Sequence, residues 1–212
     1  MSKPKTTIDL VGDEWKLSVD EICARYGTNA TTGLTTSQSK LNRKQYGKNE
    51  YKDKNAPKKS KEEKEKEKQL KEQQKLAKKA AKGEKKEEKK KDDVKKMDEH
   101  YGTISVLRDG QVAPMSSKKL VVGDIVELAA GQEVPADVRI IVSNGLQVDP
   151  SAVTAGSPKT MGINSTNDNP METDNLAFFH SKVVAGSGRG VVIAVGKSTK
   201  SAQLQKSAKL VQ

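Results

Sequence analysis

The chain has 212 residues, a formal net charge of +11 and only 33% hydrophobic residues. Its longest apolar run covers Val191 to Val195, whereas a helix that crosses a bilayer needs about 20 mostly apolar residues. The N-terminus lacks the apolar stretch of a secretory signal, and a single cysteine, Cys23, excludes an internal disulfide. We therefore expect a cytoplasmic chain without a membrane span.

Composition divides the chain into three predicted parts. Residues 1–57 form an N-terminal helical module, residues 58–99 form a linker made mostly of Lys and Glu, and residues 100–212 form a β domain with nearly balanced charge. More than half of the net charge lies in the linker, so the charge says little about the folded parts. Because only the last part is long enough to bury a core of its own, we expect residues 100–212 to fold independently.

Two helix-start signals mark the N-terminal module. Residues 18–21 (SVDE) and 35–38 (TTSQ) both have the form of a capping box, in which two side chains satisfy backbone N–H groups at a helix start. The first predicts a helix that ends at Tyr26, and the second predicts a helix that Gly47 terminates. We expect a helical hairpin with too little core to be stable alone.

The linker, residues 58–99, places opposite charges four residues apart, which favours a helix. Its few apolar residues do not sustain the heptad of a coiled coil. We expect a helical or disordered spacer, and a surface that binds polyanions is the alternative. Because aromatic and arginine side chains are missing from it, binding to nucleic acid would be weak, nonspecific and sensitive to salt.

From Tyr101 on, the hydrophobic pattern is that of strands. Asp109-Gly110 is a hairpin turn signal, and apolar runs rich in branched residues predict several short strands. Residues 185–190 (AGSGRG) predict a tight connection between two of them, and Ser198 is expected to cap a last helix. The predicted fold class is therefore α+β, with a helical hairpin, a charged helical linker and a compact antiparallel β domain.

No cofactor or metal site is expected. Residues 196–199 (GKST) resemble the end of a phosphate-binding loop, but the glycine required at position 191 is a valine, so a turn before a helix is favoured. His100 and His180 have no partners at the spacing of metal ligands. His180 is predicted to be an ordinary residue at a strand end.

Longer blocks of sequence carry a family resemblance. Residues 121–127 (VVGDIVE), 131–141 (GQEVPADVRII) and 166–179 (TNDNPMETDNLAFF) resemble the actuator domain of P-type ATPases, the last block that of the sodium/potassium-pump type in particular. Residues 17–27 and 33–49 resemble the N-terminal module of the same subfamily, with Lys48 where a proline is usual. The resemblance implies a truncated alpha subunit with a distorted jelly-roll β domain, because the phosphorylation, nucleotide-binding and membrane domains of a whole pump are not found.

The loop Thr154-Ala155-Gly156-Ser157 lies where the family has Thr-Gly-Glu-Ser. In the family, that glutamate positions and activates the water that hydrolyses a phosphoaspartate. Gly156 stands in its place and has no side chain for the task. The resemblance therefore implies a degenerate loop without a catalytic residue, in a protein that is not an enzyme.

Three hypotheses of function follow. The favoured one is a cytosolic regulator or decoy that binds a full-length P-type cation pump and is held at the membrane through that partner. The second is a polyelectrolyte adaptor that binds an anionic membrane or nucleic acid through residues 58–99. The third is a fragment or relic of a cation-transporting ATPase with no independent function.

Overall fold

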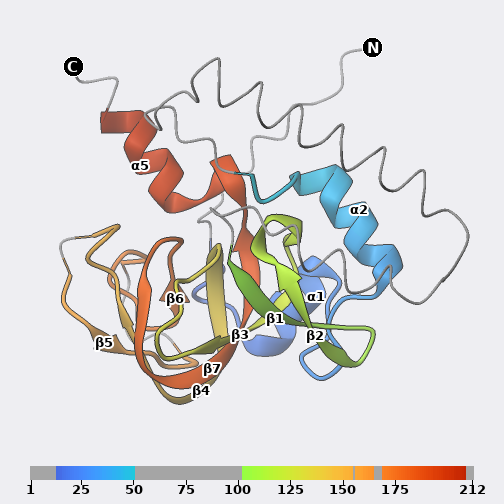
Figure 1. Cartoon of the computed structure of the whole chain (residues 1–212), viewed down its shortest axis with the longest axis horizontal. Coiled ribbons are helices and arrows are strands. Elements are labelled where there is room, and N and C mark those ends of the chain that lie inside the picture. The colour runs from blue at the N-terminus through green and yellow to red at the C-terminus, as the bar shows by residue number, and fades with distance from the viewer. Residues whose placement is uncertain (1–12, 51–101, 155, 165–168, 209–212) are drawn as a thin grey trace, which may run out of the picture. The chain divides into compact units, whose positions relative to one another are not determined.

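Two short helices precede the sheet in the part of the chain that the structure describes (Figure 1). The computed structural model describes residues 13–50, 102–154, 156–164 and 169–208, with side chains up to residue 204 in the last helix. All of these residues belong to one of two compact units. The predicted linker, residues 58–99, lies outside the described residues together with both of its boundaries.

Helix α1 (Val19–Tyr26) forms as the first capping box predicts. The Ser18 hydroxyl accepts a hydrogen bond from the Glu21 amide at 3.3 Å, and the Glu21 carboxylate accepts one from the Ser18 amide at 2.8 Å. Gly27 follows the helix in the left-handed conformation, with φ of 64°. The start and the end of this helix are thus both confirmed.

Helix α2 (Thr36–Tyr46) has only half of its predicted capping box. The Thr35 hydroxyl accepts a hydrogen bond from the Gln38 amide at 3.1 Å. The Gln38 side chain instead donates to Asn42 at 2.9 Å, one turn further along the helix. Gly47 follows the helix end as predicted.

Within the described ranges, seven strands form one antiparallel sheet. They are β1 (Thr103–Arg108), β2 (Gln111–Ser116), β3 (Ile125–Ala129), β4 (Asp137–Asp149), β5 (Lys159–Thr160), β6 (Leu176–Ala177) and β7 (Lys182–Ala194). The order across the sheet is β2-β1-β3-β7-β4-β5, and β6 pairs with β4 (Figure 1). The predicted α+β class is confirmed. No helix among the described residues is long and apolar enough to cross a membrane.

The prediction of a connection at residues 185–190 was wrong, because β7 continues through them, with a register shift near Gly186. The glycines there allow β7 to approach β4 closely. A Cβ atom at Gly186 would lie 2.1 Å from the Gly145 carbonyl oxygen, and one at Gly190 would lie 2.1 Å from the Val138 side chain. The run of small residues therefore serves strand packing and not a turn.

The last helix, α5 (Lys200–Ala208), begins two residues after its predicted cap. Ser198 lies in a preceding 3₁₀ turn, η2 (Gly196–Ser198). A buried carboxylate does the capping instead, since Asp137 Oδ2 accepts a hydrogen bond from the Lys200 amide at 2.6 Å. A phosphate at this helix start would meet that carboxylate, which supports the prediction of a simple turn at residues 196–199.

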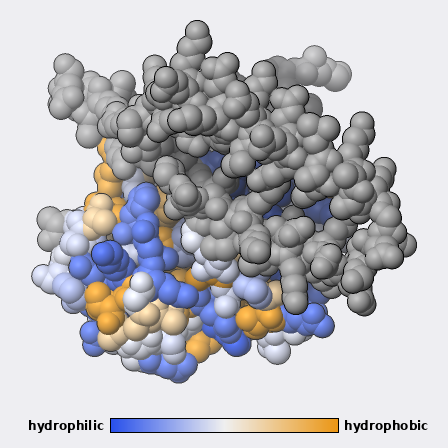
Figure 2. Space-filling view, viewed as in Figure 1, coloured by the Kyte–Doolittle hydropathy of each residue, from blue (hydrophilic) through white to orange (hydrophobic). Residues whose placement is uncertain are grey.

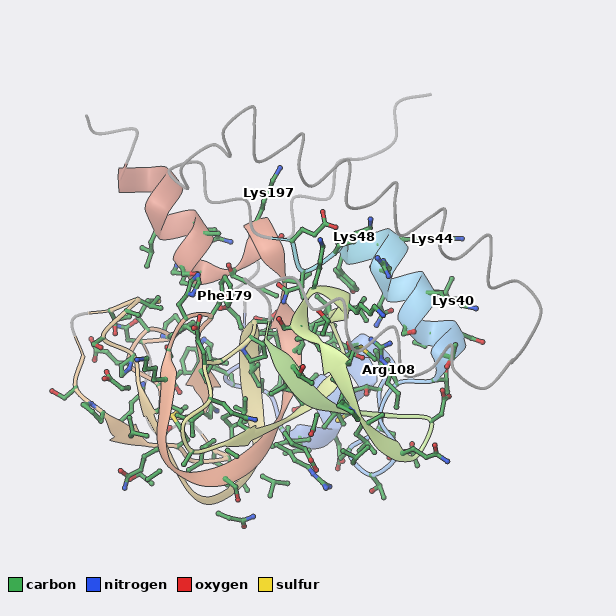
Figure 3. All side chains as sticks on the ribbon, viewed as in Figure 1. Lys40, Lys44, Lys48, Arg108, Phe179 and Lys197 are labelled. Carbon is green, nitrogen blue, oxygen red and sulfur yellow. The ribbon has the colours of Figure 1, made fainter. Side chains whose placement is uncertain are left out.

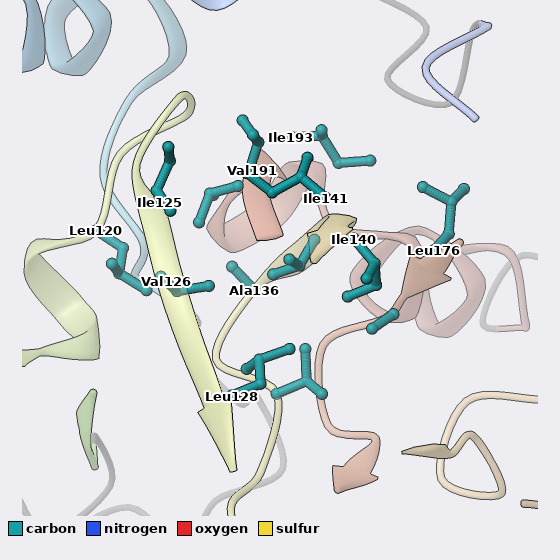
Figure 4. Packing of buried hydrophobic residues seen from close by; sticks show 14 of the residues in the cluster. Leu120, Ile125, Val126, Leu128, Ala136, Ile140, Ile141, Leu176, Val191 and Ile193 are labelled. Atoms are coloured by element: carbon teal, nitrogen blue, oxygen red, sulfur yellow. The ribbon is translucent and has the colours of Figure 1, made fainter. Parts of the chain in front are cut away.

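The hydrophobic core reaches from the sheet into the N-terminal module. Branched side chains of β3, β4 and β7 pack together at its centre (Figure 4). Trp15, Ile22 and Tyr26 belong to the same cluster, with 6%, 0% and 5% of their surfaces exposed. The module thus covers core that the β domain alone would leave open to solvent.

Buried amide side chains fasten the module to the loops of the β domain. Asn42 Nδ2 donates to the Val122 carbonyl oxygen at 2.9 Å. Asn49 Nδ2 donates to the carbonyl oxygens of Ser117 and Pro135 at 2.9 and 2.8 Å. Both asparagines are 2% exposed, so replacing either one by an apolar residue would remove a donor from buried carbonyl groups.

The predicted hairpin turn between β1 and β2 is confirmed and has a second role. Asp109 and Gly110 both have positive φ, 49° and 75°, as a tight turn of this kind requires. The Asp109 carboxylate accepts hydrogen bonds from the Thr36 amide at 3.0 Å and from its hydroxyl at 2.5 Å. These bonds lower the pKa of Asp109 and place a negative charge at the start of α2.

We expect Gly33→Ala to destabilise the fold at the junction between module and sheet. Gly33 has φ of +73°, and an added Cβ atom would lie 2.0 Å from the Leu107 carbonyl oxygen of β1. The backbone must shift to relieve this overlap, so the free energy of unfolding should fall by about 2–3 kcal/mol in urea titrations. Gly102→Ala is the control, because nothing lies within 4 Å of the added atom. Equal midpoints for the two variants would contradict the expectation.

Candidate functional site

The candidate loop, residues 150–158, connects β4 with β5. Asp149 Oδ1 at the end of β4 accepts a hydrogen bond from the Ser151 amide at 2.9 Å, which turns the chain out of the sheet. The amides of Val153 and Thr154 then donate to the Pro150 carbonyl oxygen at 2.8 and 2.9 Å. The first half of the loop is therefore fixed by its own backbone.

The structure describes three of the four residues singled out in the sequence. Thr154 is half-buried, and Gly156 and Ser157 are exposed, while Ala155 lies outside the described residues. The Thr154 hydroxyl accepts a long hydrogen bond from the Gly156 amide at 3.4 Å. Thr154 thus supports the loop from within, whereas Gly156 and Ser157 face solvent.

Gly156 occupies a position where a side chain fits with small adjustments. An added Cβ atom would lie 3.2 Å from Pro150 Cγ and 3.3 Å from Thr154 Oγ1. These two atoms would have to move by a few tenths of an ångström to make room for it. The backbone of Gly156 is not in the left-handed region. A glutamate at this position could therefore extend into solvent without unfolding the loop.

The loop itself carries no ionisable side chain, and both flanking charges are engaged locally. Hydrogen bonds from the Ser151 amide and then its hydroxyl lower the pKa of Asp149. Lys159 Nζ donates to the carbonyl oxygens of Thr173 and, at 3.3 Å, Glu172, and burial lowers its pKa. Nothing in the loop can therefore accept a proton from an attacking water.

A second polar site, which the sequence did not reveal, lies at His180. Its Nδ1 atom is 2.5 Å from Glu133 Oε1, and its ring lies 3.8 Å from that of Phe179. The pair lines a cavity of about 280 Å³ that also touches Ile104 and Pro135. The prediction of an ordinary strand end missed this pair because Glu133 and His180 are distant in sequence and meet only through the fold.

This second site does not amount to a metal centre. Among the residues that the structure describes, no three His, Cys, Asp or Glu side chains lie close enough together to hold a metal ion. Cys23 is buried on α1, as its helical spacing indicates, and burial raises the pKa of its thiol. A buried, protonated thiol is a packing residue and a poor nucleophile.

Profiles of known protein families match both folded parts of the chain. A profile of the P-type ATPase actuator domain matches residues 100–209, and a profile of the cation transporter/ATPase N-terminus matches residues 14–61. The sodium/potassium-transporting ATPase subunit alpha-A of Artemia franciscana is 31% identical over 223 aligned residues, which cover 87% of this chain and 22% of that subunit. This chain therefore spans about a fifth of that relative's length.

Vertebrate subunits match over a shorter region. The alpha-3 subunit of Gallus gallus is 46% identical and the alpha-1 subunit of Catostomus commersonii 45% identical, each over 44% of this chain and 9% of the subunit. A crystal structure of a zinc-transporting PIB-type ATPase in the E2.Pi state is 20% identical with a TM-score of 0.38, over 51% of this chain and 16% of that chain. Because the actuator profile matches just over half of its residues, this chain belongs to the P-type ATPase family.

Proposed function

We propose that this chain is a noncatalytic actuator-domain protein that binds a P-type cation pump on its cytoplasmic side. The observation that supports the proposal is the loop at residues 150–158. It keeps an ordered first half and an exposed tip, while the position of the family's catalytic carboxylate is held by Gly156. A protein with such a loop could occupy a docking site without supplying the group that activates water.

The proposal requires a preference for one state of the pump. A ligand shifts a conformational equilibrium only if it binds one state better than another. The loop would meet that condition by contacting the phosphorylated form through its exposed residues Gly156 and Ser157, with Thr154 supporting them from within. Bound there, it would shield the phosphoaspartate from water and bring no base of its own.

The test adds the purified chain to membranes that contain a sodium/potassium pump and follows decay of the phosphoenzyme. If half of the phosphoenzyme is held in a complex that does not hydrolyse, its mean lifetime should increase about twofold. The double variant Ala155→Gly with Gly156→Glu restores the family's residues, and we expect it to bind the same state but to shorten the lifetime relative to the native chain.

A matched control separates the loop from a general change in charge. Gly102→Glu adds the same carboxylate at an exposed position with open space around it, and we expect it to act like the native chain. If neither the native chain nor the double variant binds the pump or changes the lifetime, the regulator hypothesis is rejected. The hypothesis of a relic with no independent function would then be preferred.

A further inference from the structure

Charge is unevenly distributed along the N-terminal module. Between Ile22 and Asn49 the sequence contains five basic residues and no acidic one. Three of the five lie on α2, at Lys40, Arg43 and Lys44, and all three are exposed. Like charges four residues apart weaken a helix by about 0.3 kcal/mol, so the fold gains nothing from placing Lys40 beside Lys44.

The fold extends this charge beyond α2. The Gly196 amide donates to Asn49 Oδ1 at 2.9 Å, and a Cβ atom at Gly196 would lie 2.8 Å from the Lys48 carbonyl oxygen. This contact brings Lys197 of η2 next to Lys48, although the two are far apart in sequence. Figure 3 shows the resulting lysine row, which consists of Lys40, Lys44, Lys48 and Lys197.

Few carboxylates in the described part of the chain offset the row. Glu50 approaches Lys48 Nζ at 3.8 Å, and both side chains are well exposed. Such a pair contributes little in water. The Asp109 carboxylate lies at the start of α2 but is engaged by the amide and hydroxyl of Thr36. The row is therefore a positively charged surface, and the folding of the described residues does not depend on its charge.

An apolar side chain lies within this basic face. Leu41 is 55% exposed, although it belongs to a helix that packs its other side against the β domain. It follows Lys40 directly and lies one turn before Lys44, so the three side chains share the outer face. On the face of the β domain that is coloured in Figure 2, apolar groups are interspersed with hydrophilic ones.

We propose that the lysine row with Leu41 docks on an anionic phospholipid bilayer. Lysines attract lipid phosphates and carboxylates as point charges, and a leucine between them can enter the boundary between headgroups and acyl chains. Single-stranded nucleic acid is the poorer fit, because the one aromatic residue of α2, Tyr46, is half-buried with its ring 6.0 Å from that of Tyr26. The surface is independent of the loop at residues 150–158 and of any pump.

The test measures cosedimentation of the full chain with protein-free vesicles. Binding is expected with phosphatidylcholine vesicles that contain about 30% phosphatidylserine, and not with phosphatidylcholine alone. The double variant Lys40→Gln with Lys44→Gln should weaken binding about 25-fold, or about fivefold for each lysine. The double variant Lys85→Gln with Lys86→Gln removes the same charge from the linker and should weaken binding less than about threefold.

Leu41→Ser distinguishes a bilayer from a polyanion. It should weaken binding to vesicles severalfold even at about 0.5 M salt, where electrostatic attraction is screened, and should leave binding to a short RNA unchanged. Lys40, Leu41 and Lys44 are exposed, so the α2 variants should melt like the native chain. Equal losses from the α2 and linker variants, tighter binding to RNA than to vesicles, or unchanged vesicle binding by Leu41→Ser would each overturn the proposal.

Discussion

Removal of residues 1–50 is expected to abolish cooperative unfolding of the β domain. The deletion uncovers the part of the core that Trp15, Ile22 and Tyr26 close. Burial of a large apolar side chain contributes about 1.5–3 kcal/mol, and a typical domain is stable by only 5–15 kcal/mol. Loss of three such side chains, together with the polar contacts of the module, is comparable to the whole stability. Thermal melts followed by far-ultraviolet circular dichroism, which reports on the backbone of the sheet, would measure the loss.

Addition of a peptide of residues 13–50 is the control for this deletion. If the module acts by covering the core, the peptide should restore the melt when it is supplied as a separate chain, with a midpoint that rises with peptide concentration. A deleted chain that melts cooperatively near the native temperature without the peptide would contradict the expectation. That result would instead support the independent folding of residues 100–212 that composition alone suggests.

The features that sequence predicted correctly depend on neighbouring residues. Ser18 and Glu21 are three residues apart, and the turn at Asp109-Gly110 needs only its own backbone geometry. Their hydrogen bonds form within one turn of chain, so the local pattern contains nearly all of the relevant physics. For the same reason, the position of Gly156 in the candidate loop could be read from the sequence before its surroundings were known.

The features that sequence missed depend on contacts between distant segments. The glycines of residues 185–190 look like a turn until β4 lies against them. The pair of Glu133 and His180 and the place of Lys197 beside Lys48 likewise need the fold to bring separate loops together. Residue type can indicate that a side chain is able to make such contacts, but no local pattern specifies the partner.

Arg139 is the most demanding of these nonlocal features, and Arg139→Met should cost about 3–5 kcal/mol of stability. Its side chain is 1% exposed, and burial lowers its pKa to about 10, which leaves it charged at neutral pH. The guanidinium donates to the carbonyl oxygens of Glu14 at 3.2 Å, Leu17 at 2.9 Å and Ile140. Methionine matches much of its length but provides no donor, so all three carbonyl groups would lose this partner.

Urea unfolding of Arg139→Met, with Arg43→Met as the matched control, tests this expectation. Arg43 is exposed on α2, and its substitution should change stability by less than about 0.5 kcal/mol. Arg139→Lys keeps the charge but presents a compact ammonium in place of a planar fork, so its loss of stability should lie between those of the two methionine variants.

Peptide binding then separates two causes of the stability loss in Arg139→Met. Because two of the three carbonyl groups belong to residues 13–50, Arg139→Met in the deleted chain should also weaken binding of that peptide, whereas a defect confined to the sheet would leave the peptide's affinity unchanged.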